Sequence, residues 1–147
     1  MNYFEHFKLG DQWELGSWQV SAEEAINFAK EYDPQPIHTD PEMAAKSPFG
    51  AIIVSGWFTT LKTGRRFIDH IMKDTAGLAS PGMEGVNWLR PVMLNEEISG
   101  FARVLDVKAS KSKPDRGKVW FEMYAENKKG QKVMSTKGLF FIAKQPT

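Results

Sequence analysis

The hydrophobic pattern changes period about halfway along the chain, and this change limits the folds that the chain can adopt. In the first half, apolar residues recur at helical spacing. In the second half, the segments 98–107, 118–126 and 131–142 are long and rich in aromatic and β-branched residues, as antiparallel strands are. Residues 114–117 and 127–130 between them have the composition of turns. The second half therefore predicts an antiparallel sheet.

The beginning of the chain predicts a strand followed by a helix. Residues 13–20 form the first expected strand. The next four residues, Ser21–Glu24, match a capping box, in which the first and last side chains bond each other's backbone. A helix over residues 22–32 should follow, because Pro34 disfavours helical geometry at the residue before it.

Two more helices are expected before the sheet. Asp40 suits an N-cap and Pro41 suits the first turn, so a short helix should run to about Lys46. After a turn at residues 47–50, a long helix should end near Asp74, and we expect it to form the centre of the core. Its predicted core-facing stripe consists of Trp57, Leu61, Gly64, Ile68, Ile71 and Met72.

These elements predict an α+β fold in which a sheet wraps around a helix. Val86 and Trp88 indicate one additional strand before Pro91. No repeat, linker or low-complexity segment divides the sequence, so we treat residues 1–147 as a single domain. A chain of this length can bury a substantial core.

Composition excludes several classes of function. The formal net charge is +1, from 19 basic and 18 acidic residues, so no overall field favours nucleic acid or an acidic membrane. The absence of cysteine excludes disulfides, thiolate metal sites and a cysteine nucleophile. No apolar run approaches the roughly 18 residues of a membrane span, and no signal peptide is visible at the start, so we expect a cytoplasmic protein.

The segment between Asp33 and His38 carries the clearest chemical signal. It places a carboxylate and an imidazole on a proline-stiffened loop directly after a helix. Such a pair can hold one water molecule between them, polarise it for addition and return a proton, which is worth roughly 10² to 10⁴ in rate per group. Asp33 before a proline also suits an ordinary turn, so the residues alone leave a structural role open.

The wider segment resembles the signature of the MaoC-like, (R)-specific enoyl-CoA hydratases. In that signature an aromatic residue and a short spacer precede Asp, any residue, Asn, Pro, an aliphatic residue and His. Four positions match at the same spacing: Asp33, Pro36, Ile37 and His38. Two positions depart from it, because Gln35 replaces the asparagine and Tyr32 stands where glycine is usual.

A second match lies in Gly50–Gly56, which resembles the family's turn into its central helix. A histidine commonly precedes the glycine in that turn, and Ser55 stands there in this chain. A glycine at residue 56 would let a thioester carbonyl approach a backbone N–H at the helix start, where the helix dipole favours negative charge. Gly56 also fits a second explanation, in which a small residue simply allows close packing.

The resemblance implies a fold, a reaction and an assembly. The fold would be the hotdog fold, in which a curved antiparallel sheet surrounds a central helix and two chains pair to form the active site. Asp33 and His38 would be the catalytic pair that adds water to a trans-2-enoyl thioester, and the resemblance leaves open which of them takes the proton from water. Gly56 would bind the carbonyl of a coenzyme A or carrier-protein thioester, while Trp57 and Phe58 would narrow the acyl pocket. No metal or redox cofactor is implied.

Two other functions use the same fold. A hotdog thioesterase would hydrolyse the thioester, although such enzymes usually carry an acidic residue on the central helix and residues 56–66 contain none. A non-catalytic acyl-thioester binding subunit would keep the pocket without chemistry, and the departures at Gln35, Tyr32 and Ser55 favour it. Asp33, His38 and Asp40 match no common spacing of metal ligands.

Overall fold

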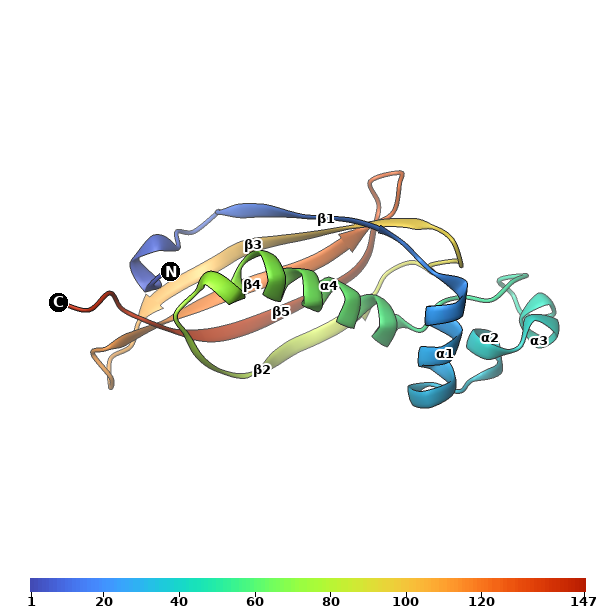
Figure 1. The fold of residues 1–147 in the computed structure, drawn as a ribbon, viewed down its shortest axis with the longest axis horizontal. Coiled ribbons are helices and arrows are strands. Elements are labelled where there is room, and N and C mark those ends of the chain that lie inside the picture. Colours follow the sequence, from blue (N-terminus) through green and yellow to red (C-terminus); the bar gives the residue numbers. More distant parts are fainter.

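The computed structural model describes all 147 residues and contains one five-stranded antiparallel sheet with the order β1-β3-β4-β5-β2. A long helix, α4 (Gly56–His70), lies along one face of the sheet, and the sheet curves around it (Figure 1). This arrangement confirms the predicted α+β architecture. The strands are β1 (Gln12–Gln19), β2 (Gly77–Trp88), β3 (Glu97–Ala109), β4 (Arg116–Glu126) and β5 (Lys132–Ala143).

Three shorter helices extend beyond one end of the sheet (Figure 1). They are α1 (Ala22–Tyr32), α2 (Pro36–Thr39) and α3 (Pro41–Ala45), and two 3₁₀ turns, Phe4–His6 and Met72–Asp74, complete the fold. As predicted, α1 begins at Ala22, and the Ser21 hydroxyl accepts a bond from the Glu24 amide at 3.2 Å. The Glu24 carboxylate instead pairs with Lys62 of α4 at 2.8 Å, so the reciprocal half of the predicted capping box is replaced by a tertiary contact.

The core lies between α4 and the inner face of the sheet, in two clusters. One cluster surrounds Phe67 near the end of α4, where its ring packs edge-on against Phe121 at 5.1 Å between centroids. The other surrounds Phe58 near the start of α4 and includes Ile98 and Met134. Full burial of each of these side chains stabilises the fold by about 1.5–3 kcal/mol. The second cluster supports the end of the sheet at which α1–α3 lie.

The predicted apolar stripe of the long helix is wrong for most of its length, although its last two members, Ile71 and Met72, pack in the core. Trp57, Leu61 and Ile68 are about half exposed, at 48%, 59% and 48%. The buried face instead includes Thr59 and Thr63, and the Thr63 hydroxyl bonds the Thr59 carbonyl at 2.8 Å, which satisfies its polar atom within the helix. These threonines make the buried face look polar in the sequence. Regular helix also stops at His70, and the segment to Asp74 is a 3₁₀ turn.

Strand β2 is longer than the sequence indicated. Val86 and Trp88 mark only its end, because the preceding residues lack an alternating pattern and include a proline. Its pairing with β5 is interrupted by three shifts of register, and Gly82 and Gly85 have positive φ angles there. β2 lies at the edge of the sheet and pairs only with β5. Its other edge is therefore open.

Candidate active site

The structure brings Asp33 and His38 together at the end of the sheet where α1 and α2 meet. Asp33 ends α1, because Pro34 follows it, and Pro36 then occupies the first turn of α2, which contains His38. The His38 Nε2 atom lies 3.4 Å from Asp33 Oδ2. The sequence did not predict α2, but the two flanking prolines are what produce the turn that joins the two side chains.

The hydrogen bonds of His38 fix its orientation. Its side chain is buried, and Nδ1 lies 2.7 Å from the carbonyl oxygen of Ile53. A carbonyl oxygen only accepts hydrogen bonds, so Nδ1 carries the hydrogen and donates it. Nε2 therefore faces Asp33 and is free to accept or release a proton.

Asp33 is held by two neutral donors. The Gln35 side-chain amide donates to Oδ1 at 2.6 Å, and the Ser55 hydroxyl donates to Oδ2 at 2.8 Å. Partial burial, the largest single influence, would raise the pKa of Asp33, but the bonds from Gln35 and Ser55 and the interaction with His38 together outweigh it. The pKa of Asp33 is thus below its ordinary value, and the group is a carboxylate at neutral pH.

The start of α4 forms the wall opposite this pair. The amides of Gly56 and Trp57 donate to no other group of the protein, and the Ser55 side chain makes no capping bond to the helix. The Trp88 indole packs directly on Gly56, so a Cβ at residue 56 would overlap the ring. The packing of Trp88 therefore requires a glycine at residue 56. Trp88 Nε1 donates to Thr60 Oγ1 at 3.0 Å, which holds the indole in place.

A pocket of about 480 Å³ connects these groups. This volume lies within the range of small-molecule sites. Its polar lining includes Asp33, Gln35, His38 and Gly56. Most of the remaining lining is apolar and includes Phe49, Val54, Trp57, Trp88, Leu89 and Val133.

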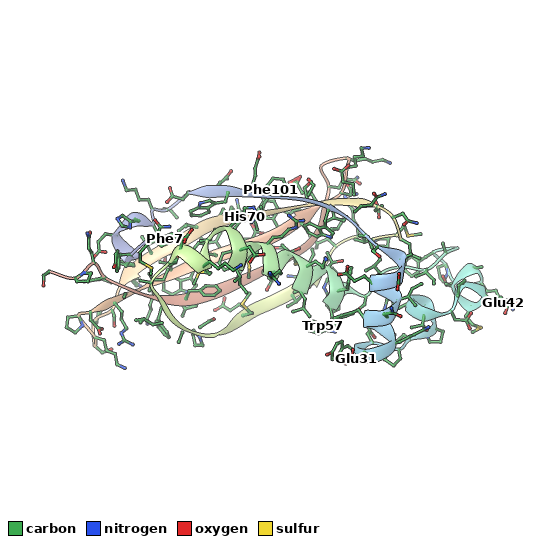
Figure 2. The ribbon with its side chains drawn as sticks, in the orientation of Figure 1. Phe7, Glu31, Glu42, Trp57, His70 and Phe101 are labelled. Atoms are coloured by element: carbon green, nitrogen blue, oxygen red, sulfur yellow. The ribbon has the colours of Figure 1, made fainter.

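The two aromatic residues that the sequence suggested for the acyl pocket have different positions. Trp57 lines the pocket and packs edge-on against Trp88 at 5.0 Å between centroids. It lies at the end of α4 nearest to α1, as Figure 2 shows. Phe58 points into the core, where it packs against Phe28 at 5.5 Å, and it does not line the pocket.

Sequence reasoning missed three residues that build the site. Gln35 and Ser55 were noted only as departures from a signature, yet both bond Asp33 directly. Trp88 was assigned only to a strand, although it forms the wall over Gly56. For Gln35 and Ser55 the available signal was the departure from the signature itself, because Gln35 lies between Asp33 and His38 and Ser55 lies next to Gly56. For Trp88 the contact depends on the packing of β2 against α4, which no local pattern shows.

The structure contains no group of three or more His, Asp or Glu side chains arranged to hold a metal ion. Asp40, near the predicted pair in sequence, caps α3 by accepting bonds from the Glu42 and Met43 amides at 3.0 and 3.3 Å. No helix of this protein is long and apolar enough to cross a membrane. The pocket offers an ionised carboxylate, an imidazole and, from the lining residues Gly56 and Trp57, two helix amides that have no acceptor within the protein.

Comparisons with known proteins point to one family. The family model described as "MaoC like domain" matches residues 8–124. Uncharacterized protein YdeM of Bacillus subtilis (strain 168) is 30% identical over 102 residues, which cover 69% of this chain and 72% of YdeM. The crystal structure of the MaoC-like dehydratase from Rhodospirillum rubrum is 30% identical and covers all of both chains with a TM-score of 0.91.

An (R)-hydratase from A. caviae involved in PHA biosynthesis shares the fold, with a TM-score of 0.72 over 95% of this chain and 98% of that one, at 21% identity. The hotdog fold predicted from the resemblance is confirmed by these structures. Since the family model also spans the segments that contain Asp33, His38 and Gly56, the chain belongs to the MaoC-like family of hydratases and dehydratases.

Proposed function

We propose that this protein catalyses the (R)-specific hydration of trans-2-enoyl thioesters, or the reverse dehydration of 3-hydroxyacyl thioesters. The observation that carries the proposal is the pairing of the Asp33 carboxylate with His38 Nε2 at 3.4 Å, in a pocket whose other wall is the start of α4. The apolar remainder of the pocket suits an acyl chain. The thioester carrier is coenzyme A or an acyl carrier protein.

In the proposed reaction, the thioester carbonyl accepts a hydrogen bond from the Gly56 amide, which has no acceptor within the protein. This bond and the helix dipole stabilise the negative charge that develops on the carbonyl oxygen, and one such donor is typically worth about 2.7–4 kcal/mol. Water held between Asp33 and His38 adds its oxygen to C3 and gives one proton to the pair. The pair returns a proton to C2. The two side chains act as a coupled unit in this scheme.

The proposed hydration involves no net oxidation or reduction, so it needs no redox cofactor, and the proposed roles of Asp33, His38 and Gly56 call for no metal. The predicted cytoplasmic location stays a prediction.

The test follows the enoyl absorbance of crotonyl-CoA and of a longer trans-2-enoyl-CoA with the purified protein, and determines the configuration of the product. We expect (R)-3-hydroxyacyl-CoA from the native chain and almost none from Asp33→Asn. Asp40→Asn is the matched control, because asparagine caps α3 about as well as aspartate does and Asp40 does not line the pocket. Release of free thiol without loss of the double bond would instead identify a thioesterase.

One observation favours a second candidate, a non-catalytic subunit that binds acyl thioesters. Both oxygens of Asp33 already accept a bond from the protein, so the carboxylate has less capacity left for water. For that candidate, acyl-CoA would bind tightly to the native chain, and binding would survive Asp33→Asn and His38→Ala with no turnover by any of the three proteins.

We also propose that the chain works as a homodimer. Two features of the monomer are left uncovered: the half-exposed apolar α4 residues Trp57, Leu61 and Ile68, and the open edge of β2 with its unpaired backbone polar groups. A second copy that pairs through β2 would cover both. Leu61→Glu should convert the dimer to a monomer in analytical ultracentrifugation, whereas Leu9→Glu, at another exposed leucine in the N-terminal segment, should not.

A further inference from the structure

The chain has two serines at the N-caps of its longer helices, and they behave differently. Ser21 caps α1 in the ordinary way, because its hydroxyl accepts a bond from the Glu24 amide at 3.2 Å. Ser55 precedes α4 in the same position but makes no capping bond, although it is completely buried. Its hydroxyl instead forms a hydrogen bond to a residue outside α4.

The recipient of that hydroxyl is Asp33. The Ser55 Oγ atom lies 2.8 Å from Asp33 Oδ2, and a carboxylate only accepts, so Ser55 is the donor. Oδ2 is also the oxygen that lies 3.4 Å from His38 Nε2. Ser55 thus holds the same atom that faces the imidazole, while Gln35 holds the other oxygen at 2.6 Å. Two donors from two segments fix the plane of the carboxylate.

The same bond has a consequence for the start of α4. A capping serine would accept from the second or third amide of the helix, but the Ser55 hydroxyl points elsewhere. The Phe58 amide uses the main-chain carbonyl of Ser55 at 3.0 Å, and the Gly56 and Trp57 amides are left without an acceptor. Asp33 and the amide of Trp57, which lines the pocket, are therefore linked through the Ser55 side chain.

We propose that Ser55 is a positioning residue that aligns Asp33 with His38 and, by giving up its capping bond, leaves the Trp57 amide available to the substrate beside the Gly56 amide, which no cap would occupy. This inference rests on the proposed hydratase function. The family commonly has histidine at this position, so the role belongs to this chain's own residue and not to the shared signature.

Asp33 has few charged neighbours, so the effect of the Ser55 hydroxyl on its pKa can be measured. His38 of α2 is the only charged group that contributes to the lowered pKa of Asp33, and the other contributors are the neutral donors Gln35 and Ser55. Arg90, from the segment after β2, is the one further charged residue that lines the pocket. Removal of the Ser55 hydroxyl takes away a bond to the ionised form, so the pKa of Asp33 should rise.

The experiment compares the native chain with Ser55→Ala, Ser55→Thr and Ser21→Ala. In Ser55→Ala, kcat/KM for crotonyl-CoA hydration should fall roughly tenfold or more near pH 6. The acid limb of its pH profile should also move to higher pH, because the carboxylate is then protonated sooner. Ser55→Thr keeps the hydroxyl and should retain the native profile. Ser21→Ala should lower the melting temperature and leave the profile unchanged.

A second measurement does not depend on turnover. The ring signals of His38, followed by NMR as pH is lowered, report the protonation of the neighbouring Asp33. That inflection should move to higher pH in Ser55→Ala and stay in place in Ser55→Thr. An unmoved inflection in Ser55→Ala would overturn the role of Ser55. A moved inflection in a protein that hydrates no enoyl-CoA would keep the Ser55–Asp33 link and reject the proposed function.

Discussion

Two carboxylates of this protein are largely buried, and their surroundings differ in one instructive way. Asp33 is held by neutral donors, Gln35 and Ser55, and opens into a pocket. Glu122, on β4, lies on the face of the sheet opposite α4 and is 4% exposed. It pairs with two cations, with Arg103 Nε at 2.7 Å and Lys132 Nζ at 3.1 Å, and lines none of the larger pockets.

In both carboxylates burial would raise the pKa and the partners lower it below the ordinary value. For Glu122 the Ser135 hydroxyl, which donates at 2.6 Å, contributes along with Lys132 and Arg103. A lowered pKa therefore does not by itself mark a functional group. The difference lies in the partners: Glu122 is paired with the permanent cations of Arg103 and Lys132, whereas Asp33 has neither Lys nor Arg as a partner, lies beside the His38 imidazole and opens into a pocket. We conclude that Glu122 has a structural role.

The largest expected effect tests this assignment through activity. Asp33→Asn removes the proton acceptor and should lower kcat/KM for enoyl-CoA hydration by about 10² to 10⁴. Glu122→Gln should change it less than twofold, because Glu122 faces away from α4 and its pocket. Steady-state kinetics of the two variants at pH 7 check this. Equal losses in the two variants would remove the distinction between the two carboxylates.

The second expected effect concerns stability, and here the larger loss is expected at Glu122 and the smaller one at Asp33. Glu122→Gln breaks two ion pairs from a buried position and should lower the free energy of unfolding by about 1–3 kcal/mol. Asp33→Asn should cost less, because the amide oxygen of asparagine can still accept from Ser55 or Gln35. Urea unfolding at pH 7 measures both values. A larger loss for Asp33→Asn would show that Asp33 has the structural role.

The sequence predicted most of the fold because most of its elements have regular periods. The three long strands and the cap at Ser21 needed only local patterns. The long helix was placed correctly, but Trp57, Leu61 and Ile68 of its predicted core face are exposed, since Thr59 and Thr63 look polar and are buried in their place. Such a face cannot be assigned from the sequence when a helix has apolar residues on two sides.

The site was predictable only where its residues lie close in sequence. Asp33 and His38 share one short segment and one signature, and the structure brings them together. Ser55 reaches Asp33 only because α4 packs beside α1. The network around Glu122 was not predicted at all. Its partners come from β3 and β5, and their contact depends on the register of three strands, which composition does not specify.

The third effect is the loss of stability in acid. Because the folded-state pKa values of Asp33 and Glu122 are lowered, each group contributes fully above its unfolded value, which is about 3.9 for Asp and 4.3 for Glu. That contribution is lost as pH falls through the folded value, since the unfolded chain then binds more protons. The free energy of unfolding of the native chain should therefore fall below about pH 5. Urea unfolding between pH 3 and 7 should show a shallower decline for Glu122→Gln, and parallel curves would contradict the lowered pKa.

The smallest effect separates the two cations that hold Glu122. Lys132 is about one-third exposed and also lies over the Tyr124 ring at 4.3 Å, so it is partly screened by solvent. Lys132→Met should lower the free energy of unfolding by at most about 1 kcal/mol, because Arg103 and Ser135 still hold the carboxylate. If the two side chains interact directly, the loss in Glu122→Gln/Lys132→Met should be smaller than the sum of the single losses. Additive losses would mean that Lys132 stabilises the sheet through Tyr124 and not through Glu122, and Arg103 would then be the cation that compensates the buried charge.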